Sequence, residues 1–149
     1  MRLNSPKINI ITRTCMKASR SLIRDFGEIE NLQVSSKGPG DFVTSADKRT
    51  EKIIIEELQK AHPDYGIITE ESGIIKGEKE TIVIDPIDGT KEYINSSPNF
   101  TVNFALIEYR VPVFGLISQP HSGIIWYSFR GKIFYYQFIS FFYSIIRNF

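Results

Sequence analysis

Apolar side chains near the start of the chain recur every three or four positions, which is the period of a helix. Ser5 followed by Pro6 is typical of a helix start, and Gly27 is typical of a helix end. The spacing therefore predicts a helix over residues 6–26 with one buried face. That face consists of Ile8, Ile11, Cys15, Ala18, Leu22 and Phe26.

A second helix is predicted after a turn at residues 37–41. Residues 44–47, Thr-Ser-Ala-Asp, resemble a capping box, in which a threonine and an acidic residue three positions later cap the helix start. The helix is expected to end at His62, before Pro63, and His62 is expected to be solvated. Its predicted inward side chains are Thr50, Ile54, Leu58 and Ala61.

Beyond residue 65 the pattern changes to short apolar runs that favour strands. They cover residues 66–69, 81–84, 101–107, 111–118 and 123–127. Residues 108–110 and 119–122 are predicted turns between successive strands. Two N-terminal helices followed by mostly antiparallel strands predict an α+β protein, with the helices packed on a largely antiparallel sheet.

The amino-acid composition limits the classes of protein to which this chain can belong. A chain of 149 residues with 42% hydrophobic and 23% charged residues is typical of one globular domain. The net charge of +1 argues against a strongly basic nucleic-acid-binding protein. The single cysteine, Cys15, cannot form an internal disulfide. We expect a cytoplasmic protein, because the first residues do not resemble a secretory signal.

The C-terminal segment differs from the rest. No acidic residue follows Glu108, and residues 133–146 form an uncharged run of 14. As a helix this run would span roughly 21 Å, less than the roughly 30 Å membrane core, so a buried or exposed apolar segment is favoured over a membrane anchor. A helix-like spacing connects Phe134, Phe138, Phe141, Ile145 and Phe149.

Two acidic clusters follow apolar strands, at residues 69–73 and 85–90. Carboxylates that converge without cationic partners repel one another, and a hard cation such as Mg²⁺ relieves that repulsion. A turn at Asp88 and a solvated loop at residues 70–71 are the alternative interpretation of each cluster alone. Their joint placement, with Asp47 upstream, favours a metal site.

The second cluster adds an anion site to the metal site. Asp85 and Asp88, three residues apart in a tight turn, can face one point, with the carbonyl of Ile87 between them. Gly89 and Thr90 are predicted to open a short helix whose free N–H groups attract an anion. A metal site beside an anion site suits the hydrolysis of phosphate esters.

These motifs resemble the inositol monophosphatase family. Its signature is similar to residues 85–90, Asp-Pro-Ile-Asp-Gly-Thr, preceded by a strand and by residues 70–72, Glu-Glu-Ser. Residues 40–47 match the family's upstream element, and residues 21–38 are similar to its bacterial SuhB-like branch. The resemblance covers residues 5–132 and implies a lithium-sensitive, Mg²⁺-dependent phosphatase with the first half of an α-β-α-β-α layered fold.

The resemblance also implies roles for single residues. Glu70, Asp85, Asp88 and the Ile87 carbonyl would bind metal, with Asp85 bridging two ions. Thr90, hydrogen-bonded to Asp47, would position the attacking water, and Glu70 would polarise it through the metal. The implied substrate contacts are Glu70, Ile87, Asp88, Gly89 and Thr90.

Two departures from the family leave the activity open. Residues 91–94, Lys-Glu-Tyr-Ile, together with residues 100–107, are more similar to the 3′(2′),5′-bisphosphate nucleotidase branch than to the SuhB-like branch. The expected substrate is inositol 1-phosphate, with a bisphosphate nucleotide as the alternative. A regulatory protein of the transcription machinery without turnover is a third alternative, and a non-functional remnant that keeps the motifs by descent is a fourth.

The second departure concerns length. The family's second half, with a further metal-binding aspartate in a Trp-Asp motif, has no counterpart in this sequence, whose only tryptophan is Trp126. We therefore expect residues 1–132 to form a truncated phosphatase domain that is weak or inactive and that dimerises or associates, and residues 133–149 to be an aromatic tail unlike the family.

Overall fold

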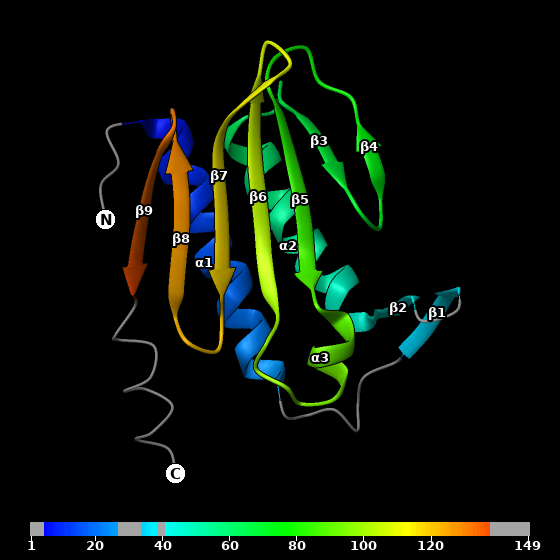
Figure 1. Ribbon diagram of the computed structural model, residues 1–149. Helices are drawn as coiled ribbons and strands as arrows, with labels where there is room; N and C mark the ends of the chain where they lie inside the picture. Colours follow the sequence, from blue (N-terminus) through cyan, green and yellow to red (C-terminus); the bar gives the residue numbers. More distant parts are fainter. Residues whose placement is uncertain (1–4, 27–33, 39–40, 138–149) are drawn as a thin grey trace.

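The computed structural model describes residues 5–26, 34–38 and 41–137. Two long helices, α1 (Pro6–Asp25) and α2 (Ser45–Ala61), lie side by side on one face of a seven-stranded sheet (Figure 1). The sheet contains β3 (Gly66–Thr69), β4 (Gly73–Ile75), β5 (Thr81–Asp88), β6 (Thr101–Glu108), β7 (Val111–Gln119), β8 (Ile124–Phe129) and β9 (Lys132–Gln137). No helix among the described residues is long and apolar enough to cross a membrane.

The predicted largely antiparallel sheet is confirmed. The strand order is β4-β3-β5-β6-β7-β8-β9, and among these described strands only β3 and β5 pair in parallel. The β6–β7 hairpin turns at Tyr109 and Arg110, whose φ angles of 51° and 66° are typical of a tight hairpin turn. A separate hairpin of β1 (Val34–Gly38) and β2 (Asp41–Thr44) leads into α2, and a short helix, α3 (Thr90–Ile94), follows β5.

Three strand features were not predicted from the sequence. Strand β4 has only three residues, and the β1–β2 hairpin has too little hydrophobic alternation to be recognised. Strand β9 pairs with β8, so the helical interpretation of the spacing from Phe134 is wrong for residues 133–137. The rest of the predicted tail, residues 138–149, lies outside the described residues. The domain boundary predicted at residue 132 remains a prediction.

The two long helices follow the sequence pattern closely. Thr44 accepts hydrogen bonds from the backbone N–H groups of Ala46 and Asp47, and Asp47 accepts one from the Thr44 N–H, so the predicted capping box is present. Ser5 stands at the predicted start of α1, but its side chain makes no capping bond. The expected buried position of Ala61 is wrong, because this last helical residue is exposed.

His62 is also placed differently from the expectation. It is half-buried rather than solvated, since its ring stacks on Tyr65 with 4.3 Å between ring centroids. The Nε2 atom of His62 is buried and has no hydrogen-bond partner among the described residues. This stacking closes the turn that carries the chain from α2 into β3.

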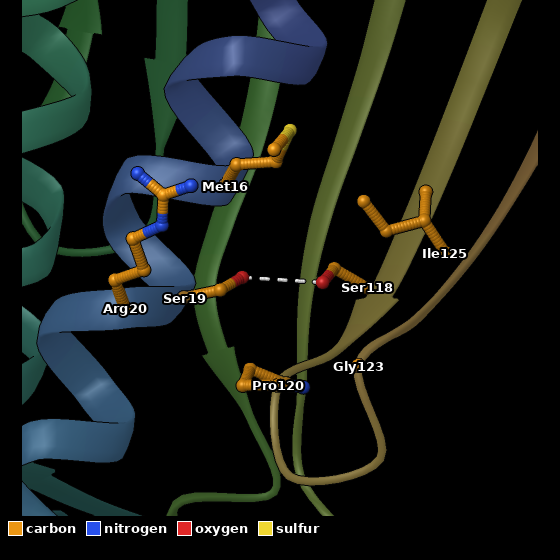
Figure 2. A pocket seen from close by; sticks show the side chains of 7 residues that line it. All are labelled: Met16, Ser19, Arg20, Ser118, Pro120, Gly123 and Ile125. Carbon is orange, nitrogen blue, oxygen red and sulfur yellow. Dashed lines mark hydrogen bonds between the residues drawn. The ribbon is translucent and has the colours of Figure 1, made fainter. Parts of the chain in front are cut away.

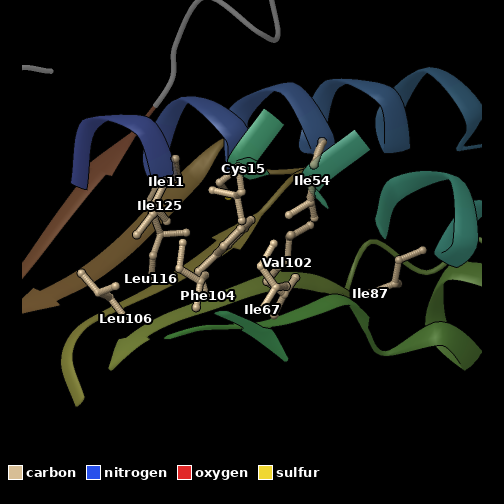
Figure 3. Close-up of a cluster of buried hydrophobic side chains, with 14 of the residues drawn as sticks. Ile11, Cys15, Ile54, Ile67, Ile87, Val102, Phe104, Leu106, Leu116 and Ile125 are labelled. Atoms are coloured by element: carbon tan, nitrogen blue, oxygen red, sulfur yellow. The ribbon is translucent and has the colours of Figure 1, made fainter. Parts of the chain in front are cut away.

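The hydrophobic core lies between the helix pair and the sheet (Figure 3). Helix α2 packs on β5, and α1 packs on β6 and β7. Inward-facing residues alternate along the strands, as expected for a sheet with one buried face. Fully buried members include Ile11, Cys15, Ile54, Ile67, Ile82, Val102, Leu106 and Leu116.

The opposite face of the sheet carries no helix in the described part of the chain. Neighbouring strands place two rows of residues there, which line a groove of about 490 Å³. Ile117 and Trp126 on this face are 47% and 38% exposed. One end of the groove reaches Asp85 and Asn103.

Cys15 is expected to be chemically inert while the protein is folded. It is 0% exposed, and burial raises the pKa of its thiol to about 12. Because the thiolate is the reactive form, a raised pKa lowers the reactivity of Cys15. The Cys15 sulfur lies 4.0 Å from the Ser19 hydroxyl oxygen. The Ser19 and Ser118 hydroxyl oxygens are 3.1 Å apart, so α1 packs closely against β7 here (Figure 2).

Iodoacetamide at about pH 8 should therefore leave the native protein unmodified and alkylate it rapidly in guanidinium chloride. Mass spectrometry would measure the extent of labelling. Equal labelling rates in the two conditions would contradict the buried position of Cys15.

Candidate active site

An irregularity in β5 brings the two predicted aspartates to one side of the sheet. Asp85 pairs with Asn103 and Asp88 pairs with Thr101, so three steps along β5 match two steps along β6. In a regular strand, residues three apart point to opposite faces, but one inserted residue reverses that relation. Pro86 lies in this bulge, where a missing N–H is tolerated.

Asp85 has an oxygen that lacks a partner. Its Oδ1 atom is buried and accepts no hydrogen bond in the described structure. Burial, reinforced by the negative charges of Glu70, Asp88 and Asp47, raises the pKa of Asp85 to about 6. A buried, repelled carboxylate oxygen of this kind is a natural ligand for a cation.

Asp88 is exposed and is held by a neighbour that the sequence analysis did not single out. Asn103 donates from Nδ2 to Asp88 Oδ2 at 3.1 Å. The Oδ1 atom of Asn103 is buried without a partner, like that of Asp85. The only sequence signal for Asn103 is a polar residue between the buried Val102 and Phe104 in a strand.

Thr90 joins the two predicted parts of the site. Its hydroxyl lies 3.2 Å from Asp47 Oδ1 and 3.1 Å from the carbonyl oxygen of Ile87, so one hydroxyl hydrogen serves two acceptors. The other oxygen of Asp47 accepts from the Thr44 N–H at 2.7 Å and from the Thr44 hydroxyl at 2.5 Å. Asp47 is 2% exposed, so this network holds Thr90 firmly.

Gly89 makes the turn between the bulge and α3 possible. Its φ of 94° lies in the left-handed region, and a Cβ there would come within 3.0 Å of the Asn99 carbonyl oxygen. Helix α3 is fixed in turn by Tyr93, which is fully buried and donates its hydroxyl to the Leu22 carbonyl at 3.1 Å. Anion binding by the backbone at Gly89 and Thr90 remains a prediction.

Glu70 follows β3 and is exposed, and its charge acts on Asp85. The loop that carries it is bound by Glu51 of α2, a buried residue that the sequence analysis missed. The sequence signal for Glu51 is its position four residues after Asp47, on the same face of the helix as Thr50 and Ile54.

The predicted ligands are thus near enough to influence one another, but they are not drawn tightly together. Among the described residues, no group of three or more His, Cys, Asp or Glu side chains forms a compact metal cluster. The donors still suit a hard cation, because all are oxygens and one, Asp85 Oδ1, is buried without a partner. The Ile87 carbonyl keeps a second lone pair beyond its bond to Thr90.

Comparison with known proteins matches most of the chain to a protein family. The profile described as the inositol monophosphatase family matches residues 4–137. The chain belongs to the inositol monophosphatase family. This is a family of phosphatases, so the family resemblance predicted from residues 85–90, the bacterial SuhB-like resemblance predicted from residues 21–38 and the predicted fold are confirmed.

Two curated relatives and one solved structure of the family illustrate the similarity. The inositol-1-monophosphatase of Mesorhizobium japonicum is 44% identical over 129 residues, covering 85% of this chain and 48% of that protein. Nus factor SuhB of Xylella fastidiosa is 34% identical, covering 87% and 47%. The crystal structure of extragenic suppressor protein SuhB from Bartonella henselae is 42% identical with a TM-score of 0.85, covering 88% and 52%.

The chain spans about half the length of the curated inositol monophosphatase relatives it matches. All the residues that the sequence analysis assigned to the site lie within the matched segment.

Proposed function

We propose that Glu70, Asp85 and Asp88 bind Mg²⁺ and serve the hydrolysis of a phosphate monoester, with inositol 1-phosphate as the substrate. One observation carries this proposal: Asp85 has a buried oxygen that accepts no hydrogen bond from the described residues and that faces three further carboxylates, in a family of phosphatases. Carboxylates whose pKa is shifted by burial and by neighbouring charges gather at functional sites, and a bound cation would compensate for the repulsion here. The 44% identity to an inositol-1-monophosphatase supports the choice of substrate.

In this mechanism, Thr90 and Asp47 orient the attacking water. Thr90 donates its hydroxyl hydrogen to Asp47 Oδ1. The lone pairs of the Thr90 oxygen are therefore free to accept a hydrogen bond from water. Asp47 keeps that orientation because its other oxygen is bound by Thr44. Bound Mg²⁺ would lower the pKa of the water and neutralise charge on the phosphoryl oxygens.

Two alternatives rest on separate observations. Residues 91–94 are similar to those of the bisphosphate nucleotidases, which favours a 3′-phosphoadenosine 5′-phosphate type of substrate. Several relatives at 34–36% identity are named Nus factor SuhB, which favours a regulatory role in the transcription machinery. Such a role requires the folded surface but no turnover.

Phosphate release by residues 1–149 distinguishes the candidates. We expect release from inositol 1-phosphate with Mg²⁺, inhibited by lithium, at a turnover number below about 1 s⁻¹, the low end of the usual range. The low rate is expected because the carboxylates of the described residues do not form a compact cluster, and such an arrangement would hold Mg²⁺ weakly. Thr90→Val should abolish release, while Thr81→Val, at the far end of β5, should leave it unchanged.

Faster release from the bisphosphate nucleotide would favour the nucleotidase alternative. No release from either substrate, with intact metal binding, would leave the regulatory role as the better proposal.

Metal binding can be tested apart from turnover. Asp88→Asn should weaken Mn²⁺ binding by about 10-fold or more, because it removes a charged oxygen ligand from a site of few ligands. Asp64→Asn is the matched control, since Asp64 pairs with Lys79 away from the site. Calorimetric titration of the three proteins gives the dissociation constants, and equal values for Asp88→Asn and wild type would refute the assignment.

A further inference from the structure

Glu51 is a buried carboxylate to which the proposed mechanism gives no role. It belongs to α2, one turn after Asp47, and is 1% exposed. No lysine or arginine pairs with it among the contacts that the structure gives it. A carboxylate without a cationic partner is costly to bury, so its hydrogen bonds must compensate for lost water.

All three side-chain hydrogen bonds that the structure gives Glu51 go to the segment that carries Glu70. Glu51 Oε2 accepts from the Thr69 hydroxyl at 2.6 Å and from the Glu71 N–H at 2.9 Å. Its Oε1 accepts from the Ser72 N–H at 2.8 Å. Thr69 stands immediately before Glu70, and Glu71 and Ser72 are the two residues after it, so the segment is held on both sides of Glu70.

The same helix face also holds the other half of the site. Asp47 and Glu51 are four residues apart, so they are neighbours on α2, about 5–6 Å apart at Cβ. Asp47 binds Thr90, next to the bulge of β5, and Glu51 binds the loop after β3. One rigid helical turn therefore sets the relative positions of the two acidic clusters.

We propose that Glu51 is a positioning residue that directs Glu70 toward Asp85 and thereby sets the metal affinity of the site. This inference rests on the proposed function, because it takes Glu70 as a metal ligand. Glu51 itself does not touch metal or substrate: both its oxygens are used by the loop. Partners that orient metal ligands typically change affinity by 10- to 100-fold when removed.

Glu51→Gln tests the proposal with little change in size. An amide has one accepting oxygen, and its NH₂ group faces an N–H donor, so at least one bond from Glu71 or Ser72 is lost. We expect amide hydrogen exchange, followed by NMR without metal, to accelerate at least about 10-fold at Glu71 or at Ser72, whichever amide loses its acceptor. The Mn²⁺ dissociation constant should rise about 10- to 100-fold, with far-ultraviolet circular dichroism unchanged.

Matched variants separate positioning from general stability. Glu56→Gln lies on the exposed side of the same helix and should change neither quantity. Thr69→Val removes one hydroxyl donor and should weaken Mn²⁺ binding about threefold, whereas Thr69→Ser keeps that donor and should restore the affinity. This pair also tests the proposal if Glu51→Gln does not fold.

Glu70→Gln distinguishes failure of the inference from failure of the proposed function. It should weaken Mn²⁺ binding while leaving the Glu71 and Ser72 amide protons protected. If Glu70→Gln binds Mn²⁺ like wild type, Glu70 is not a ligand and the proposed metal site is wrong. If Glu70→Gln weakens binding but neither Glu51→Gln nor Thr69→Val does, the positioning role is overturned.

Discussion

Asp85→Asn is expected to stabilise the metal-free protein at pH 7 while it abolishes stabilisation by Mn²⁺. The wild-type carboxylate has a buried oxygen without a partner and faces the charges of Glu70, Asp88 and Asp47. An amide removes that repulsion, and its NH₂ group can donate toward the cross-strand partner Asn103, whose Oδ1 also lacks a partner. The substitution therefore stabilises the metal-free protein but removes the carboxylate at the centre of the proposed metal site.

The pH dependence of this effect has a definite sign. Folding raises the pKa of Asp85 from an ordinary value of about 3.9 to about 6. The folded state therefore binds more protons than the unfolded state between these values, and the stability of the wild type falls as pH rises through that window. Below about pH 4 both states are protonated, so the variant should have no electrostatic advantage there.

Urea unfolding at several pH values measures the effect. One pKa unit corresponds to about 1.4 kcal/mol, and since Asp85 is only half-buried we expect Asp85→Asn to gain about 1–2 kcal/mol at pH 7. Mn²⁺ should raise the melting temperature of the wild type and of Asp64→Asn, but not that of Asp85→Asn. Asp64→Asn serves as the control. A variant less stable than wild type at pH 7, or equally stabilised by Mn²⁺, would contradict the site.

Asp47→Ala is expected to lower the free energy of unfolding by about 2–4 kcal/mol. The loss of a helix cap costs about 0.5–2 kcal/mol, and a buried donor left without an acceptor costs about 1–3 kcal/mol. Asp47 is 2% exposed and accepts from the Thr44 N–H, the Thr44 hydroxyl and the Thr90 hydroxyl. Its removal affects the start of α2 and the site together.

Thr90→Val is the control that separates these contributions. It removes only the bonds from the Thr90 hydroxyl and should cost about 1 kcal/mol. Chemical denaturation of both variants gives the comparison. If Asp47→Ala stays within about 0.5 kcal/mol of wild type, the network does not support the fold as described.

Much of the local structure could be predicted from short-range signals. The 3–4 spacing from Ile8 to Leu22 identified α1 and its buried face, and the capping box at Thr44 and Asp47 located the start of α2. These signals work because a helix places its partners within one or two turns of sequence. Strand β9 and the stacked His62 escaped prediction, because strand pairing with β8 and contact with Tyr65 override local preference.

The residues of the candidate site also fall into those that the sequence could predict and those that it could not. Residues 85–90 and 70–72 identified the chemistry, because acidic residues at strand ends and a glycine at the turn are properties of the sequence itself. Asn103 and Glu51 had no such motif. Each acts across the fold, with Asn103 reaching Asp88 from the next strand and Glu51 reaching the loop after β3 from a helix.

The sequence by itself determined the two helices, most strands, the acidic clusters and, through their motif, the phosphatase family. Only the tertiary structure decided that a bulge turns Asp85 and Asp88 to one side and that one face of α2 holds both halves of the site. It also decided that one face of the sheet has no helix over it in the described chain. The physical reason is that strand register and contacts between distant segments depend on side chains that are far apart in the sequence.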